Sequence, residues 1–221
     1  MSRHIPKRVT LFCGHYGSGK TNLAVNYAFW MKAQGLPVSI ADLDVVNPYF
    51  RTGDRAEDLK EAGIDIVTLP FANSNVDLPA LPSEIYGLVQ RHDKYAVLDV
   101  GGDDRGAYAL GRFVPYILEE NNFDMFFVAN FFRPLTRTAE QAFEIMHEIE
   151  GACGIPFTAI INNSNLGRET TARDVEETIP ICNNLSELSG LPVVFTSVDS
   201  GLRLDVKADN LFPMQLQQKL F

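Results

Sequence analysis

A glycine-rich stretch near the start of the chain, GHYGSGKT at residues 14–21, restricts the fold more than any other feature of the sequence. It matches G-x-x-x-x-G-K-S/T, in which glycines let backbone N–H groups turn toward a phosphate, the lysine adds a positive charge and the last hydroxyl can bind magnesium. An apolar run at 8–14 precedes the stretch, and a helical pattern over 21–34 follows it. Strand, loop and helix in this order predict a phosphate site at a helix N-terminus.

Short apolar runs alternate with longer segments of helical pattern along the rest of the chain. The runs are too rich in Val, Ile, Leu and Phe for half-exposed strands, so we expect helices on both faces of a parallel sheet. The alternation predicts a three-layer αβα fold of the α/β class, with about seven mostly parallel strands. The expected strands are 8–14, 37–44, 64–70, 95–102, 124–130, 156–163 and 191–198. The expected helices are 21–34, 81–91, 107–120, 138–151 and 170–188, and no linker or repeat divides residues 1–221, which predicts a single domain.

The composition argues against several classes of protein. A net charge of -9 over 221 residues weighs against a surface that binds DNA or RNA, because such a surface needs clustered lysine and arginine. No apolar stretch approaches the ~20 residues that span a bilayer, so we expect a cytoplasmic protein without a membrane partner. Cys13, Cys153 and Cys182 are far apart in the sequence, and we expect reduced, partly buried thiols. Cys13 ends the strand before the loop and keeps redox sensing as a second interpretation.

Acidic residues end two of the expected strands. IADLD places Asp42 and Asp44 at the end of one strand, and VLDVGGDD places Asp99 at the end of another, before a Gly-Gly pair and Asp103. The carboxyl ends of parallel strands meet at one edge of a sheet, so we expect these carboxylates beside the loop, where magnesium needs oxygen ligands. The glycines would let the backbone approach a terminal phosphate and move away when it leaves. An ordinary turn is the alternative for this segment.

The stretches GHYGSGKTN, ADLDVVNPYF and VLDVGGDD together resemble the ParA/MinD and nitrogenase iron protein family of P-loop ATPases. That family also includes cobyrinate amidase-like and Mrp-like nucleotide-binding proteins, and the resemblance extends over nearly the whole chain. It implies ATP and Mg²⁺ as cofactors, with Lys20 holding the outer phosphates and Asp44 positioning the attacking water as catalytic residues. It implies Thr21, Asp44 and Asp99 as metal ligands. The nucleotide-binding residues that it implies are Gly14, Tyr16, Gly17, Ser18, Gly19, Lys20, Thr21, Asn22, Gly102, Asn162 and Asn163.

The loop departs from the family pattern at its start. Many members carry a second lysine there, in K-G-G-x-G-K, which reaches across an ATP-bound dimer, whereas this chain has His15 and Tyr16. A histidine that is neutral near pH 7 supplies no permanent charge for a neighbour's phosphate. Arg51 or Arg105, in the two segments expected to respond to the nucleotide, are candidates to replace that charge. Solvated surface arginine is the alternative for both.

The segment expected to contact the base, residues 160–167, favours adenine over guanine. A guanine site usually shows N-K-x-D after a late strand, and IINNSNLG lacks the lysine and the aspartate. By the resemblance, Asn162 or Asn163 contacts the adenine; the alternative is that both residues only cap the turn.

These observations favour an ATPase that acts as a nucleotide-driven switch on a partner protein, whose identity the motifs do not encode. A nucleotide-dependent homodimer is one expected assembly. An ATP-dependent ligase or kinase of the dethiobiotin synthetase kind is the second interpretation, and a nucleotide-binding module with negligible turnover is the third. The tail at 211–221 is expected to pack against the domain or against a second copy, and a short membrane helix is the alternative.

Overall fold

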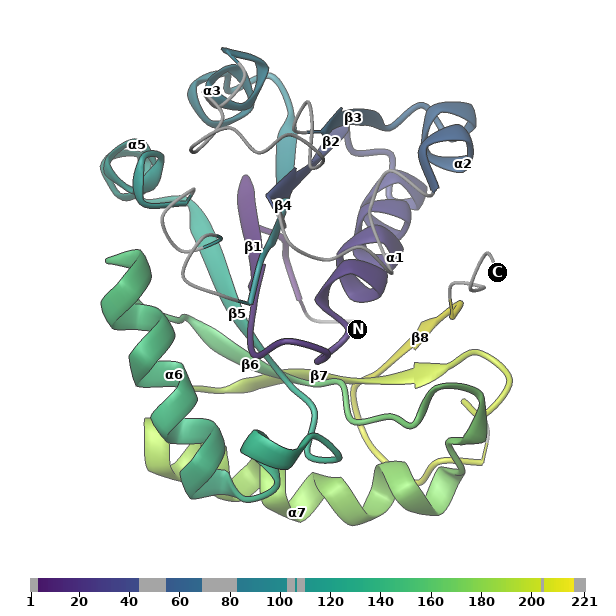
Figure 1. Ribbon diagram of the computed structural model, residues 1–221. Coiled ribbons are helices and arrows are strands. Elements are labelled where there is room, and N and C mark those ends of the chain that lie inside the picture. Colours follow the sequence, from purple (N-terminus) through teal and green to yellow (C-terminus); the bar gives the residue numbers. More distant parts are fainter. Residues whose placement is uncertain are drawn as a thin grey trace, which may run out of the picture.

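The computed structural model describes residues 4–43, 55–68, 83–102, 106, 110–203 and 205–216, and all structural statements here concern these residues. Eight parallel strands form one sheet in the order β3-β2-β4-β1-β5-β6-β7-β8. Figure 1 shows this sheet between two layers of helices. The strands are β1 (Val9–Cys13), β2 (Val38–Leu43), β3 (Asp65–Thr68), β4 (Tyr95–Val100), β5 (Phe123–Ala129), β6 (Ala159–Asn162), β7 (Val193–Asp199) and β8 (Leu211–Met214).

The helices lie on both faces of the sheet. One face carries α1 and α2, and the other carries α3, α5, α6 and α7, as Figure 1 shows. The helices are α1 (Lys20–Ala33), α2 (Ala56–Glu61), α3 (Ser83–Gln90), α5 (Val114–Glu120), α6 (Ala139–Cys153) and α7 (Ala172–Ser189), with 3-10 turns η2 (Pro134–Thr136) and η3 (Gly167–Glu169). No helix in this described part is long and apolar enough to cross a membrane.

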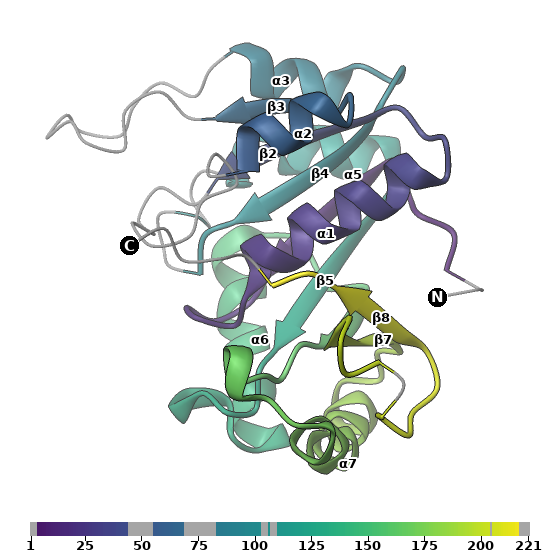
Figure 2. The same ribbon diagram turned by 90° about the vertical axis from the view of Figure 1, so that its right-hand side faces the viewer.

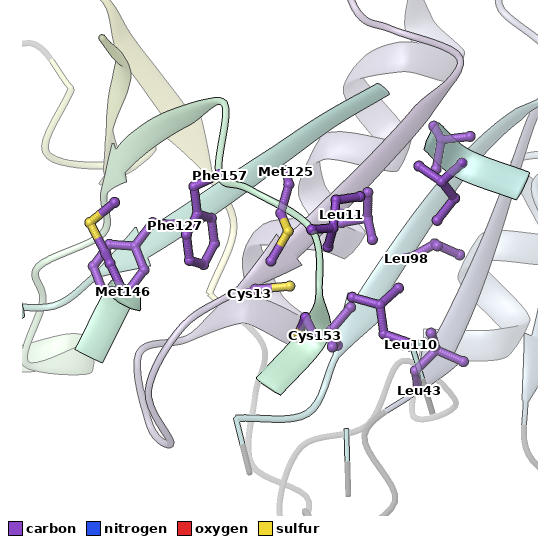
Figure 3. Packing of buried hydrophobic residues seen from close by; sticks show 14 of the residues in the cluster. Leu11, Cys13, Leu43, Leu98, Leu110, Met125, Phe127, Met146, Cys153 and Phe157 are labelled. Atoms are coloured by element: carbon purple, nitrogen blue, oxygen red, sulfur yellow. The ribbon is translucent and has the colours of Figure 1, made fainter. Parts of the chain in front are cut away.

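Alternation along the strands divides the apolar residues between two cores. On the α1 face, Phe12 and Val97 pack with Leu23 of α1. On the opposite face, Leu11 and Phe127 pack with Met146 of α6, and Figure 3 shows these side chains closely packed. Both faces are therefore covered, which explains why the strands are almost continuous apolar runs.

The three-layer α/β fold is confirmed, with eight strands in the place of about seven. The additional strand, β8, comes from the segment that was expected only to pack as a tail. Pro213 lies within β8, which is tolerated because β8 is at the edge of the sheet and a proline N lacks a hydrogen to donate. Helix α2 was not expected. The expected helix 107–120 is interrupted: residues 106 and 110–111 are helical, residues 112–113 form a turn, and α5 begins at Val114.

The topology places the loop after β1 in the middle of one edge. Strand β1 lies between β4 and β5, so the segments that follow these three strands leave the sheet side by side. Figure 2 shows the loop between β1 and α1 at the same end of the sheet as the arrowheads of β4 and β5. In open α/β sheets this edge is where ligands bind.

Candidate functional site

Within the loop from Gly14 to Thr21, two groups donate hydrogen bonds to the same backbone carbonyl. The His15 carbonyl accepts a hydrogen bond from the Ser18 backbone N–H at 3.1 Å and another from Lys20 Nζ at 3.3 Å. Lys20 and Thr21 begin α1 and are both 5% exposed. The first turn of α1 contains no acidic residue, so its N–H groups and positive dipole end remain favourable for an anion.

Gly19 is required by the path of the loop. It caps α1 in the left-handed region, with φ 85°, and a Cβ there would lie 2.6 Å from Asn163 Nδ2. That amide donates a hydrogen bond to the Ser18 carbonyl at 2.6 Å. Ser197 Oγ, at the end of β7, donates in turn to Asn163 Oδ1. Residues at the ends of β6 and β7 thus hold the loop backbone at Ser18.

The remaining expected loop residues differ in exposure. Gly14 is buried against β5, where a Cβ would meet the Val128 carbonyl at 2.6 Å. Tyr16 is 52% exposed, and Gly17 is also exposed, at the rim of the loop. Ser18 is 2% exposed, and its hydroxyl has no hydrogen-bond partner among the described residues.

Asp42 and Asp99 lie opposite each other on neighbouring strands. They are register partners in β2 and β4, and Asp99 is also paired with Phe12 of β1. Since Ile40 and Val97, two residues earlier, pack on the α1 face, alternation puts both carboxylates on that face. A helix that follows a parallel strand runs back along the sheet, so its first turn, with Thr21, lies over these strand ends. Asp42 and Asp99 thus lie side by side at this end of the sheet. Asp44 lies outside the described residues, so the expected convergence of Asp44 and Asp99 beside the loop stays a prediction.

The glycine pair after β4 contacts the loop itself. A Cβ on Gly102 would lie 2.7 Å from the Gly14 carbonyl, 2.8 Å from the Tyr16 N atom and 2.9 Å from Lys20 Nζ. All three distances are shorter than real Cβ contacts. Only glycine therefore lets this segment approach the backbone and the ammonium group so closely.

Other expected site residues fall outside the described part of the chain. Asp44, Asp103, Arg51 and Arg105 are among them. Within the described residues, no group of three or more His, Cys, Asp and Glu side chains could hold a metal ion. The described metal candidates are thus a carboxylate pair, Asp42 with Asp99, and the hydroxyl of Thr21.

The asparagines after β6 are engaged with the protein. Asn162 is fully buried; its Nδ2 donates to Thr178 Oγ1 at 2.9 Å, and its Oδ1 accepts from the Ser164 backbone and hydroxyl at 3.1 and 2.7 Å. Asn165 closes the following turn, with Nδ2 2.8 Å from the Asn163 carbonyl. These bonds agree with the turn-forming alternative, and adenine contact stays a prediction. Asn22 lies along α1, with Nδ2 3.6 Å from Met214 Sδ of β8.

Cys13 is buried beneath the loop on the α6 face, beside Cys153, as Figure 3 shows. Burial, with a smaller contribution from Cys153, raises the pKa of the Cys13 thiol well above its usual range. Lys20 lowers this pKa and Asp99 raises it, so both charges lie within electrostatic range of the thiol. All three cysteines are free and buried, and a thiol with a raised pKa is a poor nucleophile.

Two residues of the site had no motif in the sequence. Arg133, after β5, donates from Nε to the Gly17 carbonyl at 2.8 Å, and Ser197 supports Asn163. Phe-Phe-Arg-Pro after an apolar run was the available signal for Arg133. It did not indicate contact with a loop more than a hundred residues away.

Comparison with solved structures finds the same fold in the signal recognition particle receptor FtsY. For FtsY from Elizabethkingia anophelis the TM-score is 0.58 with 21% identity, covering 91% of this chain and 62% of that chain. The same receptor in complex with GDP gives 0.55 and 19%, covering 89% and 58%. Cell division protein ftsY from Thermotoga maritima gives 0.58 and 18%, covering 96% and 66%.

This chain therefore spans about three fifths of the length of the Elizabethkingia structures, and at such identities the likeness concerns the fold. No protein-family model and no curated protein sequence matches the chain. The sheet and this likeness together show that the chain shares the three-layer α/β fold of these structures.

Proposed function

We propose that the chain binds ATP with Mg²⁺ in the loop 14–21 and hydrolyses it, as a nucleotide-driven switch on a partner protein. The observation that carries this proposal is the contact of Gly102 with Lys20 and the loop backbone. A terminal phosphate held by Lys20 would compete with this contact, so its arrival and departure would move the segment after β4. Such a segment, ordered in one nucleotide state and released in the other, is the basis of many switches.

The chemistry asks little covalent work of the protein. Loop N–H groups, Lys20 and the first turn of α1 would bind the phosphates and neutralise the charge that develops when water attacks the terminal one. The hydroxyl of Thr21 and the carboxylates of Asp99 and Asp42 are the donors available for Mg²⁺, which prefers oxygen ligands. Bound magnesium would draw charge from the phosphate oxygens. By the family resemblance, Asp44 adds to this set and positions the water.

Adenine is favoured over guanine by the turn after β6. Guanine presents neighbouring N–H donors that the carboxylate of N-K-x-D accepts, and this chain has Asn165 at the place of that aspartate. Its Oδ1 already accepts the Gly167 N–H at 3.1 Å, and an amide carries no charge. We therefore expect ATP to displace a bound fluorescent nucleotide at lower concentration than GTP does.

The experiment is single-turnover hydrolysis of labelled ATP, with Lys20→Ala as the variant and Lys60→Ala, an exposed lysine of α2, as the control. We expect hydrolysis by the wild type and the control, and its loss in Lys20→Ala with the unfolding midpoint retained. Light scattering with ATP and with ADP then tests the switch, which predicts different assemblies. Hydrolysis that requires an added small carboxylic acid would indicate the ligase instead, and binding without hydrolysis would indicate a module with negligible turnover.

A further inference from the structure

Arg133 brings a positive charge to the loop from a distant part of the chain. It follows β5, and its Nε donates to the Gly17 carbonyl at 2.8 Å. The guanidinium also lies against the Gly17 backbone, because a Cβ on that glycine would be 3.5 Å from Nε and 3.7 Å from Cζ. Arg133 thus contacts the loop at its exposed rim, at Gly17.

The backbone that carries Arg133 is held firmly. The Arg133 N–H donates to the Asn130 carbonyl at 3.1 Å, and the Thr136 N–H donates to the Arg133 carbonyl at 3.1 Å. Thr136 Oγ1 also donates to the Asn130 carbonyl at 2.7 Å, and Asn130 Oδ1 accepts the Phe132 N–H at 3.1 Å. Pro134 has its own φ fixed by its ring, and it restricts the preceding residue, Arg133, to the extended backbone that the structure shows. The guanidinium therefore starts from a defined position.

Most of the hydrogen-bonding capacity of this arginine remains for another group. A guanidinium has N–H donors on all three nitrogens, and the loop contact uses only the one on Nε. No hydrogen bond from either Nη, and no ion pair, joins Arg133 to the described residues. The side chain is exposed, so these donors face solvent at the rim of a loop suited to phosphate.

We propose that Arg133 binds the terminal phosphate oxygens of a nucleotide from the rim of the loop, within the same chain. This inference rests on the proposed function. Arg133 supplies the permanent positive charge that His15 does not provide at the start of the loop. A planar guanidinium anchored through Nε directs both Nη groups the same way, which suits the oxygens of a phosphate.

The test is calorimetric titration with the Mg²⁺ complexes of ATP and ADP, and with AMP, on the wild type and on Arg133→Gln, Arg133→Lys and Arg137→Gln. Arg137 is an exposed arginine of the same segment and serves as the matched control. Arg133→Gln is expected to weaken ATP binding by about tenfold to a hundredfold, the value of a hydrogen bond between charged groups. The loss should be smaller for ADP and close to zero for AMP. Arg133→Lys should recover only part of the affinity, because lysine keeps the positive charge but lacks the Nε anchor and the paired Nη donors. Arg137→Gln should bind as the wild type does.

Two results would overturn the inference. One is ATP binding by Arg133→Gln at wild-type strength. The other is an equal loss for all three nucleotides without recovery in Arg133→Lys, which would mean that Arg133 only shapes the loop. If the wild type itself binds no ATP, the proposed function is wrong as well. If Lys20→Ala loses ATP binding while the Arg133 variants bind ATP as the wild type does, only the role of Arg133 is refuted.

Discussion

Replacing Gly19 by alanine tests how the loop is held. Two independent costs are expected from the structure. The first is conformational, because φ at Gly19 is 85° and an L-residue in this region costs about 1–2 kcal/mol. The second is steric, because the new Cβ would lie 2.6 Å from Asn163 Nδ2 and displace the amide from the Ser18 carbonyl.

The two costs can be separated by a matched control. Losing the bond leaves a buried carbonyl unsatisfied, which costs about 1–3 kcal/mol, so Gly19→Ala should lower the free energy of unfolding by roughly 2–5 kcal/mol. Gly154, after α6, has φ 71° and no atom within 4 Å of its Cβ position. Gly154→Ala should therefore show only the conformational cost, about 1–2 kcal/mol.

The assay is urea denaturation followed by circular dichroism, on both single variants, on Asn163→Ala and on the double variant Gly19→Ala/Asn163→Ala. Because Asn163→Ala already removes the bond and the clash, Gly19→Ala should cost no more than Gly154→Ala in that background. The coupling between residues 19 and 163 should be roughly 1–3 kcal/mol. The reasoning is refuted if Gly19→Ala and Gly154→Ala cost the same in the wild-type background, or if the double variant is simply additive.

Three further outcomes are expected. Asp99→Asn should raise the magnesium concentration needed for ATP hydrolysis by at least about tenfold, measured by magnesium titration, because it removes a charged oxygen ligand. Burial raises the pKa of Glu120, but the hydrogen bond and charge of Arg8 outweigh burial and leave this pKa lowered. A carboxylate with a lowered pKa stabilises the folded state at pH values above the ordinary glutamate range. In urea titrations the wild type should therefore be more stable than Glu120→Gln above about pH 5, and this difference should shrink below about pH 4. Burial raises the pKa of Cys153 to about 11 and raises that of Cys13 well above its usual range. A thiol reagent at about pH 8 should therefore label these cysteines only after unfolding, and fast labelling of native Cys13 would contradict its burial.

The sequence predicted the parts of the fold that repeat a simple pattern. Continuous apolar runs gave the central strands, and the helical pattern over 138–151 located α6. The structure shows a capping box at its start, in which Thr138 and Gln141 lie within one helical turn. Strand β8 was missed because four residues that include a proline resemble a loop. Their strand conformation depends on pairing with β7 and on burial of Phe212 against α1 and β7.

In the candidate site, too, some residues could be predicted from the sequence and others could not. The loop and Asp99 could be found because glycine, lysine and aspartate types are fixed by local chemistry next to a strand end. Arg133 and Ser197 could not, because each acts through one hydrogen bond to a residue distant in sequence. Asn163 is one of two candidates for the base contact, and the sequence did not indicate the hydrogen bond from its amide to the loop backbone. Only the order of strands brings these residues to one edge.

The central claim is that the backbone from Gly14 to Thr21 receives the phosphates of a nucleotide, and calorimetric titration with Mg-ATP tests it most directly. The account predicts saturable binding at one site per chain for the wild type and for Lys60→Ala. It also predicts binding at least about a hundredfold weaker for Lys20→Ala with the fold intact, since a buried lysine charge is lost from the loop. An absence of binding by the wild type, or equal binding by Lys20→Ala, would contradict it.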